Sequence, residues 1–370
     1  MVFIAVHLGA GVHSQKLSKR YKAICNEACR LGTHLLISHP SPSAQTVAAT
    51  VCKFLEDSNL TNAGTGSNLT AAGTIECDAS IMSSEFCRGA AVGCISGVRN
   101  PVLVAERLLR QSFVPLSAGR VAPLFLVGDG ALQFAKAQDM ELATTEDLST
   151  RSSIIRYEYW NEILDPSTDN DPEEAAHRGD DEVLCDLITD TVGVICVDVN
   201  GEIAVASSSG GVAMKQQGRI GPAALVGSGI WAAKDDAGSK VAVCTSGTGE
   251  DIMSTNLASR CAQTLLRPPT TSPSDDQDEL RLVSSLLSTD FSNSPALQLR
   301  PASAGILAVK TELGNEDGGN DVLLQAVYGH TTKSMCVGFM TPDWGAPKVT
   351  ISRNETGAPT VSGLVARMRL

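Results

Sequence analysis

The junction between Asp190 and Thr191 constrains the fold of this chain most strongly. An acidic, loop-like stretch ends at Asp190, and a hydrophobic strand begins directly after Thr191. A threonine inside a chain is a poor nucleophile, whereas a threonine at a chain start carries its own base, because the α-amine lies beside the hydroxyl. An unperturbed α-amine titrates near ~8, where a general base is useful. Alone, the dipeptide predicts only a loop end; with the motifs elsewhere in the chain it predicts self-cleavage between these two residues.

The acidic residues are concentrated before this junction. The 370 residues carry a formal net charge of −12, and residues 139–190 alone hold 16 acidic and 3 basic side chains. The rest of the chain is near neutral and offers no basic surface for nucleic acid. Residues 139–189 are therefore expected to form a flexible acidic connector, in which only 154–164 has a helical pattern. A second polar insertion is expected at 268–301.

The cysteines and the apolar runs indicate the compartment. The eleven cysteines form no Cys-x-x-Cys pair, and many lie in apolar runs, which predicts reduced, buried thiols and no metal site. Residues 1–7 are too short for a secretory signal, and no run reaches the ~18 apolar residues of a membrane helix. We expect a cytoplasmic or nuclear protein that is not secreted and does not enter a membrane.

Hydrophobic patterning predicts strands and helices in blocks, not in strict alternation. Such blocks favour an α+β fold of stacked sheets covered by helices over βαβ units. The expected strands lie at 3–6, near 76–80, 91–95, 192–199, 203–207, 241–245, 305–311, 322–330 and 334–340, and the expected helices at 17–31, 43–55, 102–109 and within 250–266.

Three glycine-rich turns stand out after Thr191. They are Ser207–Gly211, Gly218–Gly221 and Thr245–Glu250. Each alone predicts only a turn beside a strand. None fits a dinucleotide-binding motif, because no strand–helix unit with a spaced acidic residue accompanies it.

In this order after the Asp190-Thr191 junction, the turns resemble the asparaginase type 2 family of N-terminal nucleophile hydrolases. Other segments look closer to its threonine aspartase (taspase) branch, and the resemblance spans 1–138, 186–266 and 302–355. The segments that resemble this branch are Gly9–Ser14, Leu55–Ser58, Thr61–Gly64, Gly66–Leu69, Ile75–Met82, Leu116–Arg120, His330–Thr332 and Ser334–Gly338.

The resemblance implies one catalytic domain, a four-layer αββα sandwich built from two cleavage fragments. The α fragment is 1–190, with a globular part at 1–138, and the β fragment is 191–370 and begins at Thr191. The fragments are expected to stay together as a heterodimer, and whether two αβ units associate is left open. No cofactor is implied. A structural monovalent cation near the acidic residues of 56–78 is the one ion that relatives suggest.

The resemblance also implies a catalytic group. Thr191 resembles the nucleophile, and Ser209 the hydroxyl residue that orients it. Asn62 resembles the residue that lines the site. The hydroxyl of Ser246 and the N–H of Gly247 resemble the oxyanion donors, which usually contribute about 10²–10³ in rate each.

Four further residues resemble the substrate-binding group. Arg219 matches the anchor of the substrate carboxylate, because a guanidinium fork suits a bidentate carboxylate. Gly249 belongs to the same pocket, Gly193 permits close backbone approach beside the nucleophile, and Lys19 resembles a second basic group in taspases.

One departure favours the taspase branch. Small-molecule asparaginases and isoaspartyl peptidases have an aspartate for the substrate ammonium at the position of Pro222, and proline cannot hold an ammonium group. We therefore predict a threonine endopeptidase that cuts protein substrates after aspartate. The alternatives are an L-asparaginase or isoaspartyl peptidase of the same fold and, with less support, a non-catalytic binding relative.

Overall fold

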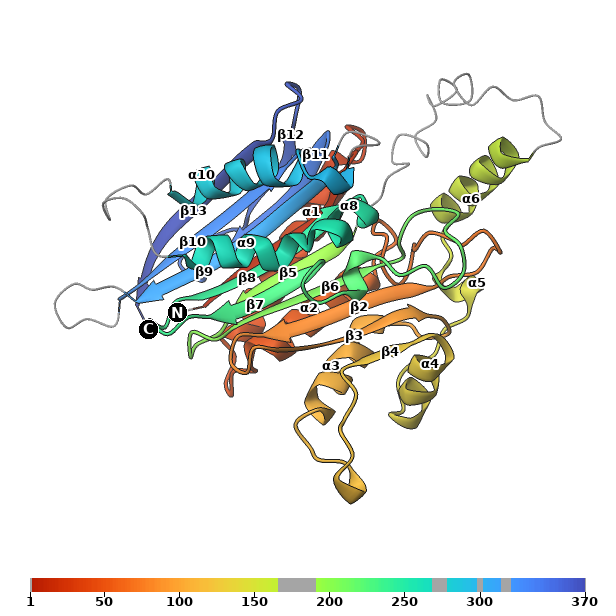
Figure 1. The fold of residues 1–370 in the computed structure, drawn as a ribbon, viewed down its shortest axis with the longest axis horizontal. Helices are drawn as coiled ribbons and strands as arrows, with labels where there is room; N and C mark the ends of the chain where they lie inside the picture. Colours follow the sequence, from red (N-terminus) through yellow and green to blue (C-terminus); the bar gives the residue numbers. More distant parts are fainter. Residues whose placement is uncertain (1, 166–190, 268–277, 298–301, 314–320, 370) are drawn as a thin grey trace.

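Four layers make up the molecule, with two β-sheets packed face to face between two layers of helices (Figure 1). The computed structural model describes residues 2–165, 191–267, 278–297, 302–313 and 321–369. This arrangement is the predicted αββα sandwich of the α+β class. The junction residue Asp190 and the connector residues 166–189 lie outside the described residues.

The larger sheet has eight strands in the order β12-β11-β1-β5-β6-β2-β3-β4. β1 lies between two strands of the second half: it pairs antiparallel with β5, where His7 is opposite Gly193, and with β11 on its other side. The first strand of the chain therefore lies directly beside the strand that follows Thr191. The strands are β1 (Phe3–Gly11), β2 (Cys77–Ser83), β3 (Arg88–Ile95), β4 (Phe125–Val127), β5 (Val192–Val197), β6 (Ile203–Ser209), β11 (Ser334–Met340) and β12 (Lys348–Arg353).

The smaller sheet has five antiparallel strands in the order β13-β10-β9-β8-β7. The chain enters the larger sheet again from β10, through a short connection at Thr331–Lys333 that leads into β11. The strands are β7 (Ile230–Lys234), β8 (Lys240–Gly247), β9 (Ala304–Leu313), β10 (Asp321–His330) and β13 (Thr360–Arg369).

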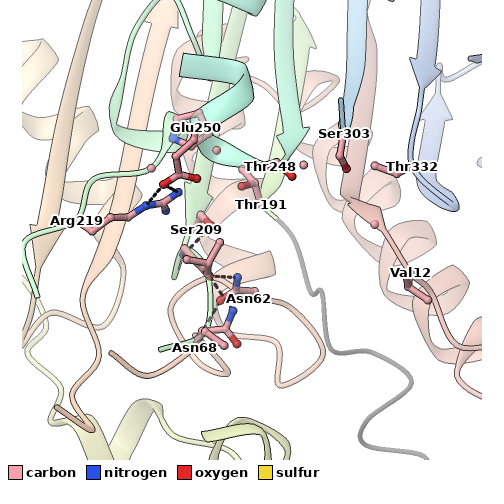
Figure 2. Close-up of a pocket in the computed structure, with 18 of the residues that line it drawn as sticks. Val12, Asn62, Asn68, Thr191, Ser209, Arg219, Thr248, Glu250, Ser303 and Thr332 are labelled. Carbon is pink, nitrogen blue, oxygen red and sulfur yellow. Dashed lines mark hydrogen bonds and ion pairs between the residues drawn. The ribbon is translucent and has the colours of Figure 1, made fainter. Parts of the chain in front are cut away.

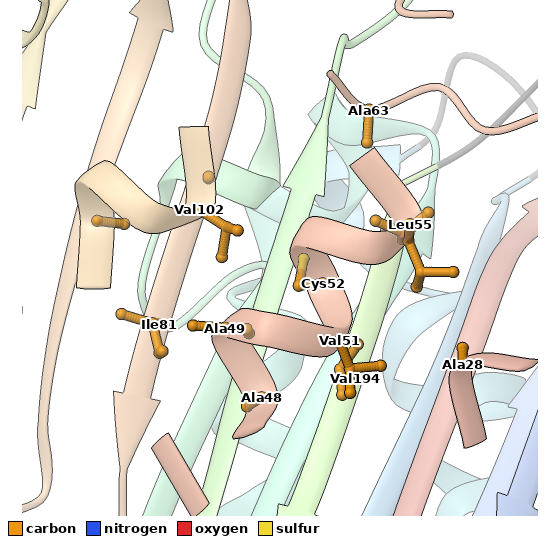
Figure 3. Close-up of a cluster of buried hydrophobic side chains, with 14 of the residues drawn as sticks. Ala28, Ala48, Ala49, Val51, Cys52, Leu55, Ala63, Ile81, Val102 and Val194 are labelled. Atoms are coloured by element: carbon orange, nitrogen blue, oxygen red, sulfur yellow. The ribbon is translucent and has the colours of Figure 1, made fainter. Parts of the chain in front are cut away.

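Three hydrophobic cores hold the four layers together. The first lies between the larger sheet and its helices, where Val51 and Cys52 of one helix pack with Val194 of β5 (Figure 3). The second lies between the two sheets and includes Phe3 and Leu307. The third lies between the smaller sheet and its helices. Helices α1 (Ser18–Leu36), α2 (Ala44–Glu56) and α3 (Pro101–Gln111) cover the larger sheet, and α9 (Leu257–Leu266) and α10 (Asp278–Ser285) cover the smaller one.

The first part of the expected flexible connector is helical. It contains α5 (Thr145–Leu148) and α6 (Arg151–Leu164), and α4 (Gly128–Ala137) lies just before it. A capping box begins α5 at Thr144 and another begins α6 at Thr150, and such reciprocal bonds satisfy N–H groups that a helix start leaves open. The helical pattern at 154–164 is therefore confirmed as part of α6, whereas α4 and α5 were not expected.

The second polar insertion also contributes structure. Within 268–301, α10 and the turn after it bring Val283, Leu287 and Phe291 into the third core. Apolar residues at helical spacing therefore bury one face of a segment whose average composition is polar. No helix among the described residues combines the length and apolarity needed to cross a membrane.

Candidate active site

A cavity of about 680 Å³ opens where the ends of several strands meet, and Thr191 lies in its wall (Figure 2). Its lining comes from both halves of the chain. The residues Gly11, Val12, Asn62, Asn68 and Trp160 line it from the first half, and Thr191, Ser209, Gly211, Arg219, Pro222, Gly247, Thr248, Gly249, Glu250, Ser303, Thr332 and Lys333 are among those from the second.

Thr191 and Ser209 come from neighbouring antiparallel strands. The register that pairs Val192 with Ser208 brings residue 191 level with the end of β6. Thr191 is 6% exposed and Ser209 is 4% exposed, and both line the cavity. The Ser209 hydroxyl accepts the N–H of Gly211 at 3.0 Å, which fixes it at the turn after β6. The two hydroxyls that the sequence singled out therefore share one cavity.

Two asparagines hold that turn from below in Figure 2. The Asn62 side chain donates to the carbonyl of Gly211 at 2.8 Å and accepts the N–H of Asn68 at 2.9 Å. The Asn68 side chain donates to the same Gly211 carbonyl at 2.7 Å and accepts from Arg156 of α6 at 2.6 Å. Asn62 is thus placed where the sequence predicted it, and Asn68 and Arg156 extend its network to α6.

Arg219 is presented by a turn that two acidic residues brace. Asp78 of β2 accepts the N–H of Gly221 at 2.7 Å, and Glu76 accepts the N–H of Gly218 at 2.9 Å. Burial raises the pKa of Asp78, and the charges of Lys215 and Arg219 together with its two backbone bonds oppose that rise. The brace fixes the backbone on both sides of the guanidinium.

The guanidinium of Arg219 is surrounded by glycines and paired with Glu250. Its Nε and Nη2 donate to Glu250 Oε1 at 2.9 and 2.8 Å. A Cβ on Gly249 would lie 2.4 Å from Nη2, and one on Gly221 would lie 3.0 Å from Nη1. A side chain at position 249 would therefore force the guanidinium or Pro222 to move, and one at position 221 would crowd the guanidinium. Arg219 and Gly249, both expected in the substrate-binding group, therefore lie side by side. Glu250, the last residue of the Thr245–Glu250 turn, joins them and was not expected there.

Of the two expected oxyanion donors, Gly247 lines the cavity and Ser246 does not. Gly247 ends β8 and lines the cavity. Ser246 is fully buried and is not among the lining residues; its hydroxyl accepts the N–H of Ala10 at 2.9 Å. In this structure the Ser246 hydroxyl joins β8 to β1 across the two sheets, and the Gly247 N–H remains the better placed of the two predicted donors.

Gly193 and Lys19 lie outside the cavity lining. A Cβ on Gly193 would lie 2.1 Å from Nε2 of His7, so close backbone approach is required there, toward a histidine beneath the nucleophile strand. Lys19 lies on an exposed face in the first turn of α1 and does not line the cavity. The structure therefore does not bring Lys19 to the other predicted residues.

His7 lies opposite Gly193 of β5, and its environment keeps it neutral. Burial lowers the pKa of His7 to about 3, the charge of His13 adds to this effect, and a backbone contact with Thr191 opposes it. An imidazole with so low a pKa is a weak base. This agrees with a mechanism in which the α-amine of Thr191, and not a histidine, takes the proton.

Two more lining residues escaped sequence reasoning. Trp160 reaches the cavity from α6, inside the segment expected to be flexible, and Lys333 reaches it from the connection between β10 and β11. No motif marks either residue, since one lies in an acidic stretch and the other follows a strand end.

The carboxylates near residues 56–78 already hold backbone and amide groups. Glu56 accepts the N–H of Val102 at 3.0 Å, and Asp57 accepts from the Asn100 side chain at 2.9 Å. Within the described ranges, no group of three or more His, Cys, Asp or Glu side chains is arranged to hold a metal ion. The monovalent cation stays a prediction, carried by the family resemblance alone.

Comparison with known proteins identifies the family. A family model described as asparaginase, of the asparaginase type 2 group, matches residues 1–275. The chain belongs to the asparaginase type 2 family. It is accordingly a hydrolase of the N-terminal nucleophile type.

Curated relatives of this asparaginase-family chain are named isoaspartyl peptidase or isoaspartyl peptidase/L-asparaginase. It is 32% identical to the isoaspartyl peptidase/L-asparaginase of Xenopus laevis, over 69% of this chain and 73% of that protein. It is 31% identical to the isoaspartyl peptidase of Escherichia coli, over 67% and 71%, and 30% identical to a putative isoaspartyl peptidase/L-asparaginase of Dictyostelium discoideum, over 69% and 76%.

These relatives overturn the predicted aspartate-specific endopeptidase, and with it the taspase assignment and the protein substrates. That prediction relied on Pro222, which cannot hold an ammonium group. In the structure Pro222 begins a short 3₁₀ turn in the cavity wall, and the carboxylate of Glu250 lies in the same cavity beside Arg219. The loss of one acidic residue therefore did not remove negative charge from the pocket.

Proposed function

We propose that this protein is an autoprocessed threonine amidohydrolase that hydrolyses L-asparagine and isoaspartyl dipeptides. The observation that carries the proposal is the meeting of Thr191, Ser209, Gly247 and Arg219 around one cavity. The names of the relatives support the substrate class.

In the proposed reaction, Thr191 Oγ1 attacks the carbonyl of the substrate's side-chain amide, and its proton passes to the Thr191 α-amine. The Gly247 N–H stabilises the oxyanion. The amine then protonates the leaving group, which departs as ammonia or as an amino acid, and a β-aspartyl ester of Thr191 remains. Water, deprotonated by the same amine, opens the ester and releases aspartate.

The Arg219–Glu250 pair supplies a recognition element for an amino-acid zwitterion. A substrate of this class carries an α-carboxylate and an α-ammonium on one carbon, and the pair offers one charge of each sign at 2.8 Å. Charge-assisted bonds of this kind are among the stronger ones in proteins. In this proposal Glu250 takes the part that an aspartate at position 222 plays in relatives.

The α-amine of Thr191 must first be released from Asp190. Members of the family are processed into α and β subunits, and the chain carries the threonine at the expected junction. We propose that Thr191 attacks the Asp190 carbonyl, forming an ester by an N-to-O acyl shift that water then opens.

The test uses purified protein with Thr191→Ala and Thr191→Ser. The wild type should run as two fragments divided near residue 190 and should release ammonia from L-asparagine and amino acid from isoaspartyl dipeptides. Thr191→Ala should remain one chain and inactive, and Thr191→Ser should divide more slowly. A wild type that divides but leaves both substrates intact contradicts the proposal.

The zwitterion element has its own test. Succinamic acid is asparagine without the α-ammonium, so the preference for asparagine over succinamic acid measures the contribution of that group. Glu250→Gln should reduce this preference about tenfold. The control is Glu141→Gln, which removes an exposed partner of Arg99 that does not line the cavity and should leave the preference unchanged. An unaltered preference in Glu250→Gln would show that Glu250 does not bind the α-ammonium group of the substrate.

A further inference from the structure

Lys333 is the one charged lining residue that the site described so far does not use. The charged side chains in the described lining are Arg219, Glu250 and Lys333. Arg219 and Glu250 pair with each other. Lys333 is exposed and makes no ion pair or side-chain hydrogen bond with any part of the chain that the structure describes. The described lining therefore carries one positive charge in excess.

The backbone that carries Lys333 is held on both sides. Thr331 Oγ1 donates to the carbonyl of Ala302 and accepts the N–H of Ala304, each at 2.9 Å. Thr332 Oγ1 donates to the carbonyl of Ser334 at 3.0 Å, and the Lys333 carbonyl accepts the N–H of Asn354 at 2.9 Å. A rigid connection thus presents a flexible cationic side chain at the cavity.

This connection lies across the nucleophile from Arg219. In Figure 2, Thr191 lies between Arg219 on one side and Thr332, the neighbour of Lys333, on the other. A substrate that places its aspartyl end at Arg219 and its scissile carbonyl at Thr191 extends its leaving group toward Thr332. The cavity therefore has a cationic element on each side of the reacting bond.

We infer that Lys333 binds the C-terminal carboxylate of the leaving residue of an isoaspartyl dipeptide. This inference rests on the proposed function. An isoaspartyl dipeptide carries two carboxylates and one ammonium, a net charge that complements the single excess positive charge of the lining. L-Asparagine has no second carboxylate, because its leaving group is ammonia. Lys333 is thus a specificity residue that favours the dipeptide over the free amino acid amide.

The experiment compares three substrates on processed enzyme: L-asparagine, isoaspartyl-alanine and isoaspartyl-alanine amide, whose leaving residue lacks the carboxylate. In the wild type, kcat/KM for the dipeptide should exceed that for its amide about three- to tenfold, mainly through KM. Lys333→Gln should abolish that difference, and Lys333→Arg should restore most of it. Because the pair is exposed, 0.5 M salt should also reduce the difference in the wild type.

Lys22→Gln is the matched control, because it removes an exposed lysine of α1 that does not line the cavity. It should leave the dipeptide-to-amide ratio at the wild-type value. If Lys333→Gln keeps the wild-type ratio while the dipeptide is hydrolysed, Lys333 is only a solvated surface cation and this inference is wrong. If the wild type hydrolyses none of the three substrates, the proposed function itself fails, so the two failures are distinguishable.

Discussion

Asp78 Oδ2 accepts the backbone N–H of Gly221 at 2.7 Å, and Gly221 lies two residues after Arg219. The other carboxylate oxygen of Asp78 accepts the N–H of Cys94 at 2.9 Å. One buried side chain of β2 thereby joins strand β3 to the turn that presents the guanidinium. The position of Arg219 depends on an acceptor that the reaction itself never touches.

Asp78→Asn should therefore weaken substrate binding. Its amide presents two N–H donors where a carboxylate oxygen accepted one, so one of the two backbone N–H groups meets a donor. A buried donor left unpaired costs about 1–3 kcal/mol. We expect KM for L-asparagine to rise about tenfold or more, with a smaller change in kcat, in steady-state ammonia assays. Glu76→Gln, which affects the more exposed bond to Gly218, should change KM less than threefold; equal effects in the two variants would contradict this account.

Gly249→Ala should displace the guanidinium of Arg219. The added Cβ would lie 2.4 Å from Nη2 and 2.9 Å from Cδ of Pro222, so either the arginine or the turn must move. We expect KM for both small substrates to rise at least tenfold. Gly130→Ala adds a methyl group in helix α4 where no atom lies within 4 Å, and it should be neutral or stabilise by up to ~1 kcal/mol. Wild-type kinetics in Gly249→Ala would contradict this prediction, because they would show that the Arg219 guanidinium can accommodate the added methyl group without losing substrate binding.

Gly193→Ala should impair processing through His7. Its Cβ would lie 2.1 Å from His7 Nε2 and 2.8 Å from Sγ of Cys244, which overpacks the region beneath Thr191. Overpacking of this kind costs about 1–3 kcal/mol. We expect a lower free energy of unfolding and a larger uncut fraction on denaturing gels.

The double variant Gly193→Ala/His7→Ala provides the control for that prediction. Removing the imidazole makes room for the new methyl group, so the double variant should process better than Gly193→Ala alone. The two substitutions should therefore be non-additive in denaturant unfolding. Strict additivity would mean that the imidazole is not what the methyl group meets.

Glu56 should make stability depend on pH. Burial raises the pKa of Glu56 to about 8, although the hydrogen bond from the Val102 N–H opposes the rise. The folded state therefore keeps a proton that the unfolded state loses above about pH 4.5. The contribution of Glu56 is fully present below that value and is lost as the pH rises through 8, on the order of a few kcal/mol.

Glu56→Gln keeps a neutral acceptor for the Val102 N–H and should remove this loss. Denaturant unfolding at pH 5 and pH 9 should show a smaller difference in free energy for the variant than for the wild type. Asp57→Asn, on the next residue, is the local control. A wild type whose stability has the same pH dependence as Glu56→Gln would contradict a protonated Glu56.

The sequence predicted the central strands and helices because they carry continuous or periodic apolar runs. β11, for example, was expected at its observed residues 334–340. The edge strands β4, β7, β12 and β13 were not anticipated. β4 has three residues, and the side chains of β12 are half or fully exposed, so neither shows the buried pattern that marks a strand.

The site was predictable where a motif carries the chemistry and not where packing alone does. Thr191, Ser209, Asn62 and Arg219 were expected from the order of their motifs, and all line the cavity. Trp160 and Lys333 belong to no motif, because only the fold brings α6 and the β10–β11 connection to the cavity. Pro222 led to the wrong prediction of the substrate class. The absence of a carboxylate at position 222 does not reveal that Glu250, 28 residues further along the chain, lies in the same cavity.

The pairing of β1 between β5 and β11 makes the proposed processing hard to reverse. A strand of the first fragment is bonded on both edges to strands of the second, so a cut at residue 190 frees a chain end without freeing a subunit. Before the cut, these strands meet within one molecule; after it, reassembly from unfolded fragments requires two chains to find each other. We expect the mature enzyme to persist as one particle until it is denatured, and then to recover activity poorly and with a dependence on concentration. Maturation in such a protein is irreversible for two reasons. The peptide bond before Thr191 is broken, and the mature fragments can no longer refold as a single chain.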